Sequence, residues 1–225
     1  MNDLGKAFSF PFKDPEWVSK FLLAAVFMVL SIVLIGIFIL AGYLVQVAQR
    51  VMRREENCLP AWDDIGVKLV VGFKYCVVHL IYVLPIVLIW IPLVVLMMIS
   101  GIAEPDAAEA LAGLGIFAWI IGMLVIIPYS LLLTAVTPII MIRFAENERI
   151  ADALDVGEIW RFFRRNWQNT CIIALIAVGL QSFAGVGLIL FIVGIFFTVF
   201  YAYLVSAYLY GTLYHEQKAE GVAVR

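Results

Sequence analysis

The stretch VKLVVGFKYCVVHLIYVLPIVLIWIPLVVLMMI, residues 67–99, decides the fold class of this protein. A helix needs roughly 20 consecutive apolar residues to cross a bilayer core, and this run exceeds that length. Four more apolar segments occupy residues 21–47, 113–142, 170–183 and 186–214. None of the five alternates with a period of two, as a membrane β-strand would. Because backbone amides in hydrocarbon must be satisfied within the segment, all five are predicted to be helical.

The composition of the whole chain supports the same class. Of its 225 residues, 64% are apolar and 14% are charged, and the mean hydropathy is +1.04. An ordinary soluble domain has about 25% charged residues, so this chain could not cover its own apolar surface in water. Soluble enzymes and nucleic-acid binders are therefore excluded. We predict an all-α, polytopic helical membrane protein that forms a single membrane domain over residues 1–225.

Basic residues collect in two connections between the apolar segments. One connection runs from Arg50 to Lys68 and the other from Arg143 to Arg165. Short loops rich in Lys and Arg stay in the cytoplasm, so both loops are expected on that side. The connection from Ser100 to Ala112 has three acidic residues and no basic one, and it is expected outside, together with an uncharged turn at Gly185.

The side of the N-terminal residues is left open by the charge rule. A single span over residues 21–47 would place Lys6, Lys13 and Lys20 outside, against that rule. A re-entrant segment bent near Gly36 would keep the three lysines inside. Both arrangements stay open.

A short pattern of residues in the first basic loop occurs again in the second at nearly the same spacing. Arg53, Glu56 and Asn57 match Arg143, Glu146 and Asn147, and Asp64-Ile65-Gly66 matches Asp155-Val156-Gly157. This internal similarity predicts a tandem repeat, in which each unit consists of a helix, an amphipathic interfacial helix and a second helix. Its halves would cover residues 21–99 and 113–183, with a final helix over 186–214. Because both charged loops share one side, the repeat would be parallel, with its axis along the membrane normal.

The amphipathic element of the second half is clear from its spacing. Its apolar stripe comprises Val156, Ile159, Trp160, Phe163 and Trp167, and the opposite face carries Asp152, Asp155, Glu158, Arg161 and Arg165. A helix of this kind is expected to lie in the membrane interface. Arg161, Arg164 and Arg165 are candidates for contact with anionic lipid headgroups. The expected counterpart in the first half covers Pro60 to Val71, with Trp62 on its apolar face. Either helix could also serve only as a buttress that fixes helix ends.

Several short motifs carry a resemblance to a known family. They are Phe12-Lys13-Asp14-Pro15-Glu16-Trp17 with Lys20, Gly42-Tyr43, Leu59-Pro60-Ala61-Trp62-Asp63-Asp64, Gly72, and Tyr82-Val83-Leu84-Pro85. Together they resemble the uncharacterised prokaryotic membrane family called domain of unknown function 4013. The resemblance implies a multi-pass helical protein of a prokaryotic cytoplasmic (inner) membrane, and it implies no activity.

The sequence contains no recognisable catalytic motif and only one candidate residue for binding a cofactor. No nucleophile stands beside a base, and neither an HExxH nor a Walker pattern occurs, so the protein is not expected to be an enzyme. His79 lies inside an apolar segment and is a weak candidate for binding a cofactor such as haem. A hydrogen-bonded packing role suits it better, because no second ligand is evident. We expect no cofactor and no metal.

Two non-enzymatic functions remain. No Asp or Glu occurs within the five apolar segments, so ion-coupled transport lacks its usual carboxylates. The sequence favours a scaffold or accessory subunit of a membrane complex, or a lipid-contacting structural protein. The alternative is a small permease or channel for a neutral or hydrophobic solute. Expected partners are membrane lipids and other membrane subunits or a second copy, and no nucleic acid.

One face of the last segment could serve in docking. Tyr203, Ala207, Tyr210 and Gly211 share that face at helical spacing. The small residues Ala207 and Gly211 would let a second helix approach closely. The same face could equally pack inside one subunit.

Overall fold

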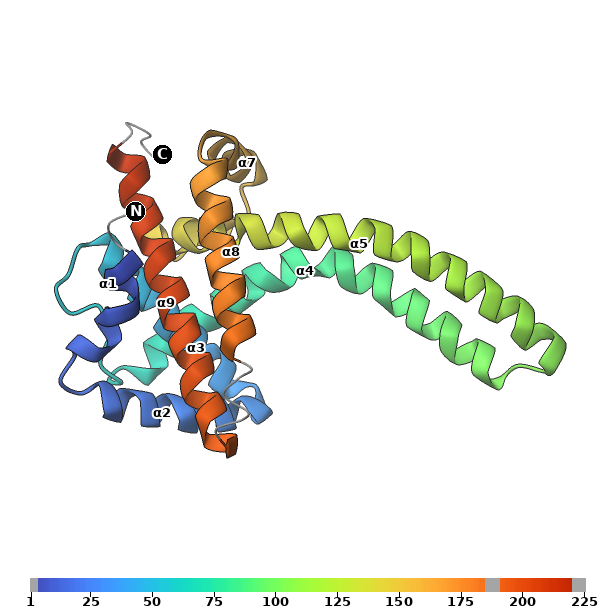
Figure 1. Ribbon diagram of the computed structural model, residues 1–225, viewed down its shortest axis with the longest axis horizontal. Coiled ribbons are helices and arrows are strands. Elements are labelled where there is room, and N and C mark those ends of the chain that lie inside the picture. The colour runs from blue at the N-terminus through green and yellow to red at the C-terminus, as the bar shows by residue number, and fades with distance from the viewer. Residues whose placement is uncertain (1–3, 185–190, 220–225) are drawn as a thin grey trace. The chain divides into compact units, whose positions relative to one another are not determined.

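The computed structural model describes residues 4–184 and 191–219, and every element in these ranges is helical (Figure 1). The predicted all-α class is therefore confirmed. In chain order the elements are α1 (Leu4–Ser9), η1 (Phe10–Lys13), α2 (Trp17–Leu30), η2 (Ser31–Val33), α3 (Ile35–Met52), α4 (Ile65–Ile102), α5 (Pro105–Asn147), α6 (Ile150–Ala153), α7 (Val156–Arg165), α8 (Trp167–Ala184) and α9 (Phe191–Ala219).

The chain divides into two compact units. The core unit comprises Met1–Val78 and Ala135–Arg225, and the hairpin unit comprises His79–Thr134. Within residues 4–184 and 191–219, four helices are long and apolar enough to cross a membrane, which supports the predicted polytopic membrane protein. They cover Ile35–Met52, Ile65–Ile102, Ala107–Asn147 and Phe196–His215.

The first apolar segment does not form one straight helix. It is divided between α2 and α3, and the break lies at residues 31–34, where Leu34 adopts the left-handed conformation with φ 66°. This break lies just before Gly36, near which the re-entrant alternative placed the bend. A Cβ atom on Gly36 would lie 1.9 Å from the carbonyl oxygen of Phe27, so the backbones of α2 and α3 touch at this glycine. The single span over residues 21–47 is thus excluded. A second bend, of 95°, separates Gly5–Lys13 from Trp17–Val33.

Helices α3 and α9 form the centre of the core unit. They pack against each other, and α8 and α2 pack against α9. Figure 1 shows α8 and α9 side by side, while the expected turn at Gly185 falls outside the described residues. Tyr43, Phe200 and Leu204 are among the fully buried side chains of this core.

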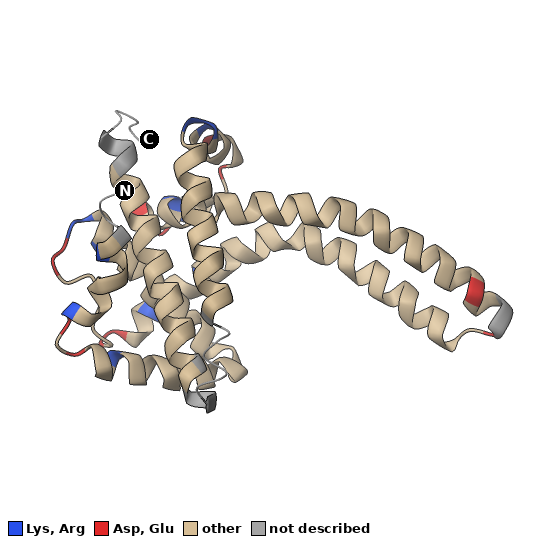
Figure 2. Ribbon diagram, viewed as in Figure 1, with Lys and Arg blue, Asp and Glu red and all other residues tan. Residues whose placement is uncertain are grey.

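The hairpin unit is built from the later turns of α4 and the early turns of α5. Trp90 and Trp119 meet edge to face with ring centroids 5.9 Å apart, and the Tyr129 hydroxyl donates to the Tyr82 carbonyl at 2.8 Å. A Cβ on Gly122 would lie 2.6 Å from Leu93 Cδ1, so the two helices pack closely there. Figure 2 shows no charge on the described helices of this unit except near their connection.

The expected outer loop from Ser100 to Ala112 is almost entirely helical. Helix α4 continues to Ile102 and α5 begins at Pro105, which leaves only two residues between them. Proline suits the first turn of a helix, and the alanine-rich residues that follow have high helix propensity. These local preferences outweigh the acidic residues that made this stretch look like a loop.

The amphipathic helix expected over Pro60 to Val71 is absent. Residues 60–64 are an irregular loop, and α4 begins at Ile65 after Asp64, whose φ is 49°. In the second half α7 does form, and the Asp155 carboxylate accepts a hydrogen bond from the Glu158 N–H at 3.0 Å at its start. The tandem repeat is therefore not confirmed and stays a prediction.

Candidate functional site

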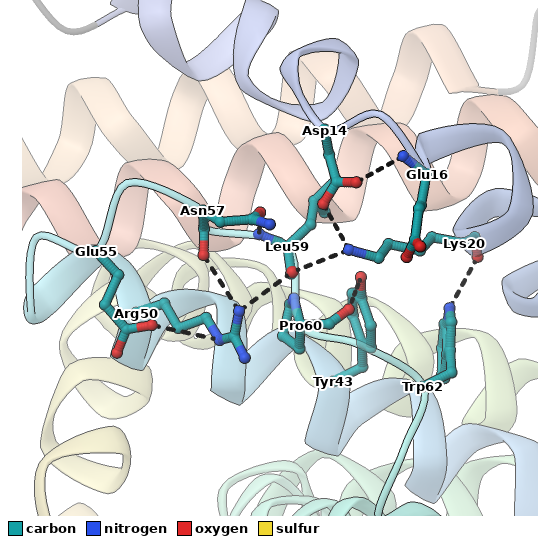
Figure 3. A network of polar contacts seen from close by, with 10 residues as sticks. All are labelled: Asp14, Glu16, Lys20, Tyr43, Arg50, Glu55, Asn57, Leu59, Pro60 and Trp62. Carbon is teal, nitrogen blue, oxygen red and sulfur yellow. Dashed lines mark hydrogen bonds and ion pairs between the residues drawn. The ribbon is translucent and has the colours of Figure 1, made fainter.

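A buried ion pair joins the N-terminal elements to the loop after α3. Asp14 follows η1, Lys20 lies in α2, and each is only 6% exposed. The Lys20 ammonium pairs with the Asp14 carboxylate and also donates to the Leu59 carbonyl at 3.3 Å (Figure 3). Asp14 in turn accepts the Glu16 N–H at 2.8 Å. Both charges are thus compensated inside the chain, as buried charges must be.

Arg50 holds the same loop from its other side. Its Nη1 donates to the carbonyls of Asn57 and Leu59, both at 3.2 Å, and its Nε lies 3.6 Å from a Glu55 carboxylate oxygen (Figure 3). Lys20 and Arg50 therefore meet at one carbonyl oxygen, that of Leu59. The conformation of the loop is fixed by two cations from two different helices.

Two aromatic side chains complete the arrangement. The Tyr43 hydroxyl donates to the Pro60 carbonyl at 3.0 Å, and the Tyr43 ring stacks on Trp62 with centroids 4.2 Å apart. The Trp62 Nε1–H donates to the Lys20 carbonyl at 3.0 Å (Figure 3). We call Asp14, Lys20, Tyr43, Arg50 and the loop of residues 53–64 the polar clamp. Trp62 lies in this loop and not on an amphipathic helix, which sequence spacing alone did not reveal.

The electrostatics of the polar clamp suit a structural role. Burial opposes ionisation of Asp14, but hydrogen bonds from the Lys20 side chain and the Glu16 backbone outweigh it and lower the pKa of this carboxyl below 3.8. Burial, and then the nearby Glu55 carboxylate, raise the pKa of the Cys58 thiol, with Arg50 acting in the opposite direction. Cys58 is therefore a poor nucleophile at neutral pH.

The backbone of α3 touches that of α4 beside the polar clamp. A Cβ on Gly42 would lie 1.9 Å from the Lys68 carbonyl oxygen, and a Cβ on Gly72 would lie 1.7 Å from that of Phe38. Both glycines belong to the sequence motifs that carry the family resemblance. Their role is to let two apolar helices approach at backbone distance.

The candidate docking face of α9 is occupied within the chain over most of its length. Ala207 and Tyr210 are buried, and a Cβ on Gly211 would lie 2.7 Å from Val51 Cβ of α3. Tyr203 is the member of this face that remains exposed. Of the two possibilities that the sequence left open, the geometry gives packing inside one subunit for these three residues.

His79 lies in α4 and is partly buried among contacts of its own chain. Over residues 4–184 and 191–219, no group of three or more His, Cys, Asp or Glu side chains is placed to hold a metal ion.

The apolar stripe of α7 is divided between two environments. Ile159 and its neighbour Phe162, which the stripe did not include, are buried against the chain. Trp160 is 47% exposed and stacks on Phe163. Trp167, which the sequence placed on the same stripe, instead begins α8 after α7 ends at Arg165, and it is 54% exposed. The exposed aromatic side chains leave an apolar surface for a bilayer interface.

The arginines of α7 lie outside this packing. Arg161, Arg164 and Arg165 are all exposed, and Arg161 pairs with Glu158 at 2.9 Å. Cationic groups are thus available next to the exposed aromatic surface.

Comparisons with known proteins give one match. The family described as "Protein of unknown function (DUF4013)" matches residues 25–199. No curated protein and no solved structure matches the chain. The matched range contains Tyr43, Arg50 and the loop of the polar clamp, and also the hairpin unit.

Proposed function

The chain belongs to the DUF4013 family of proteins of unknown function, and we propose that it is a non-enzymatic scaffold or accessory subunit of a membrane complex. In this proposal the core unit holds the protein in the bilayer. The hairpin unit offers its apolar helix faces to the helices of a neighbouring membrane protein. The membrane would be the cytoplasmic membrane of a prokaryote, with the charged loops 50–68 and 143–165 in the cytoplasm.

The apolar surface of the hairpin unit is the observation that carries the proposal. Side chains such as Leu88, Phe117, Leu124 and Leu131 are exposed along both of its helices. The hairpin keeps its own two helices together through the paired tryptophans and the Tyr129 hydroxyl. It therefore has a defined shape without further cover, and a defined apolar shape is what helix packing in a membrane requires.

The polar clamp supports a structural role for the core unit. Its cations hold backbone carbonyls of the loop, and its aromatic groups hold that loop against α2 and α3. Such contacts make a rigid support, because each buried polar group named here is paired within the chain.

Site-specific photo-crosslinking in the native membrane tests the proposal. A photoreactive residue at Leu124, which is 75% exposed, or at Leu131 should give a discrete protein adduct. Matched controls are Ile32, which is 86% exposed, and Leu175, both apolar positions of the core unit. These controls should give lipid adducts alone.

The mass of the adduct identifies the kind of partner. An adduct of twice the chain mass would make the partner a second copy, and any other discrete mass would make it a different subunit. If Leu124 and Leu131 give only lipid adducts, as the controls do, the scaffold proposal fails. Uptake of neutral solutes by liposomes that contain the protein would then become the decisive measurement, because a permease remains the alternative.

The lipid-contacting part of the proposal predicts a defined loss of affinity. An arginine near an anionic surface contributes about 1 kcal/mol. Replacing Arg161, Arg164 and Arg165 with glutamine should therefore weaken the contact of α7 with anionic lipid in nanodiscs that contain the protein by roughly 2–3 kcal/mol, with the smallest share from Arg161 because of its pairing with Glu158. Fluorescence quenching by depth-marked lipids, in a variant that keeps Trp160 as its single tryptophan, measures the contact.

Replacing Glu158 with glutamine is the matched control for this prediction. It removes a negative charge and releases Arg161, so contact with anionic lipid should strengthen. Unchanged lipid preference in the triple variant, together with quenching of Trp160 from water, would show that α7 docks in the aqueous phase.

A further inference from the structure

A polar cavity lies where the candidate membrane spans of α3, α5 and α9 end in the core unit. It has a volume of about 250 Å³. Its lining comprises Gln49, Met52 and Arg53 from the end of α3, Ala145, Glu146 and Asn147 from the end of α5, and Tyr214 from α9. The candidate membrane spans of these helices finish at Met52, Asn147 and His215. The cavity therefore lies at the level where apolar spans give way to the headgroup region of a bilayer.

The walls of this cavity are held by contacts between the three helices. The Gln49 amide nitrogen donates to the Ala145 carbonyl at 3.0 Å and to a Glu148 carboxylate oxygen at 2.9 Å. The His215 Nε2 lies 2.9 Å from the Val51 carbonyl, which joins α9 to α3. The cavity is thus part of the packed core unit.

The chemistry of the lining selects a ligand with both signs of charge. Arg53 supplies a guanidinium, and Glu146 supplies a carboxylate that is hydrogen-bonded with Tyr214. Both N–H groups of the Gln49 amide are used in the wall, so its carbonyl oxygen is the group left for a ligand. Carboxylate and carbonyl oxygens suit an ammonium with N–H donors, and a guanidinium suits a phosphate.

We propose that this cavity binds a zwitterion composed of a primary ammonium and a phosphate, as in the headgroup of phosphatidylethanolamine. The ammonium lies by Glu146 and the phosphate lies by Arg53. The volume is below the range of pockets that enclose whole drug-sized ligands, so it suits a headgroup rather than a whole lipid. A quaternary ammonium fits less well, because it prefers an aromatic cage and the lining has a single aromatic residue, Tyr214.

Native mass spectrometry of the full chain in detergent tests the proposal with three lipids. Phosphatidylethanolamine should bind about tenfold more tightly than phosphatidylcholine, which has no N–H donor, and than phosphatidylglycerol, which has no cation. Replacing Glu146 with glutamine should abolish the preference over phosphatidylglycerol. Replacing Arg53 with glutamine should weaken binding of phosphatidylethanolamine about tenfold.

Two further variants control for general loss of charge. Arg54 and Glu56 are exposed neighbours outside the lining, and their replacement with glutamine should leave all three affinities unchanged. The Arg53 variant keeps the test decisive if the Glu146 variant folds poorly, because the Arg53 side chain is 70% exposed.

Soluble glycerophosphoethanolamine separates the two sources of this headgroup chemistry. If it competes with phosphatidylethanolamine at equal concentration, the cavity takes the free zwitterion, whereas failure to compete assigns the site to the membrane lipid. Equal binding of the three lipids, with no effect of the Arg53 and Glu146 variants, would overturn the proposal. The proposal does not rest on docking by the hairpin unit, so either can fail alone.

Discussion

Replacing Lys20 with methionine is expected to lower the free energy of unfolding by about 3–5 kcal/mol. The substitution leaves the Asp14 carboxylate buried beside an apolar side chain, and it removes the donor to the Leu59 carbonyl. A buried charge without its partner is the most costly outcome of breaking an ion pair. The measurement is unfolding of the purified full chain in detergent, followed by heat or by titration with a denaturing detergent.

Two controls distinguish the loss of the Asp14–Lys20 ion pair from the general effect of removing a lysine. Replacing the exposed Lys13 with methionine should change stability by less than about 0.5 kcal/mol. Adding Asp14→Asn to the Lys20 variant removes the uncompensated charge and should restore part of the loss. If Lys20→Met is as stable as the Lys13 control, the pair does not hold the polar clamp.

The ion pair also predicts the direction of the pH dependence. The pKa of Asp14 is lower in the folded protein than its ordinary value of 3.8, so folding favours the charged carboxylate. This contribution is present above that ordinary value, and it is lost as pH falls through the lower folded-state pKa. Acid unfolding below about pH 4 should therefore be shallower in the double variant, which has no carboxylate at position 14.

Replacing Gly72 with alanine is expected to cost at least about 3 kcal/mol, the upper end of the range for overpacking. The new methyl group would lie 1.7 Å from the Phe38 carbonyl oxygen. This oxygen is a backbone atom, so no change of side-chain rotamer can relieve the clash. Helices α3 and α4 would have to separate at the polar clamp. Gly42→Ala should behave alike, because its methyl group would meet the Lys68 carbonyl oxygen at 1.9 Å.

Gly66 provides the matched control in the same helix. No atom lies within 4 Å of a Cβ at this position, and alanine has the higher helix propensity. Gly66→Ala should therefore leave stability unchanged or raise it by up to about 1 kcal/mol. Equal stability of the Gly72 and Gly66 variants would contradict close backbone packing of α3 on α4. Thermal unfolding of the three variants in one detergent makes the comparison.

The break in the first apolar segment shows where sequence reasoning reached its limit. The residues around Leu34 contain no proline, and the chain still turns there with Leu34 at φ 66°. The local sequence offers only Gly36 as a signal, and that glycine marks the close approach of α2 to α3. The position of the bend depends on packing between helices, which periodicity does not encode.

The polar clamp could be anticipated only as a set of motifs. The sequence supplied Asp14, Lys20, Tyr43 and Trp62, but their contacts join residues far apart in the chain, such as the Trp62 indole and the Lys20 carbonyl. An apolar spacing after Pro60 predicted a helix there. Tyr43 instead fixes the Pro60 carbonyl, and the Trp62 ring stacks on Tyr43.

The sequence by itself determined the membrane class, the long helices and the amphipathic α7, because hydropathy and helix propensity act within a few residues. Only the tertiary structure decided which apolar faces are covered. Ala207 and Gly211 form the same stripe whether they meet a partner or α3, and the structure places them against the chain itself. In a bilayer lipid is as apolar as a neighbouring helix, so hydrophobicity cannot distinguish these choices and close packing makes them.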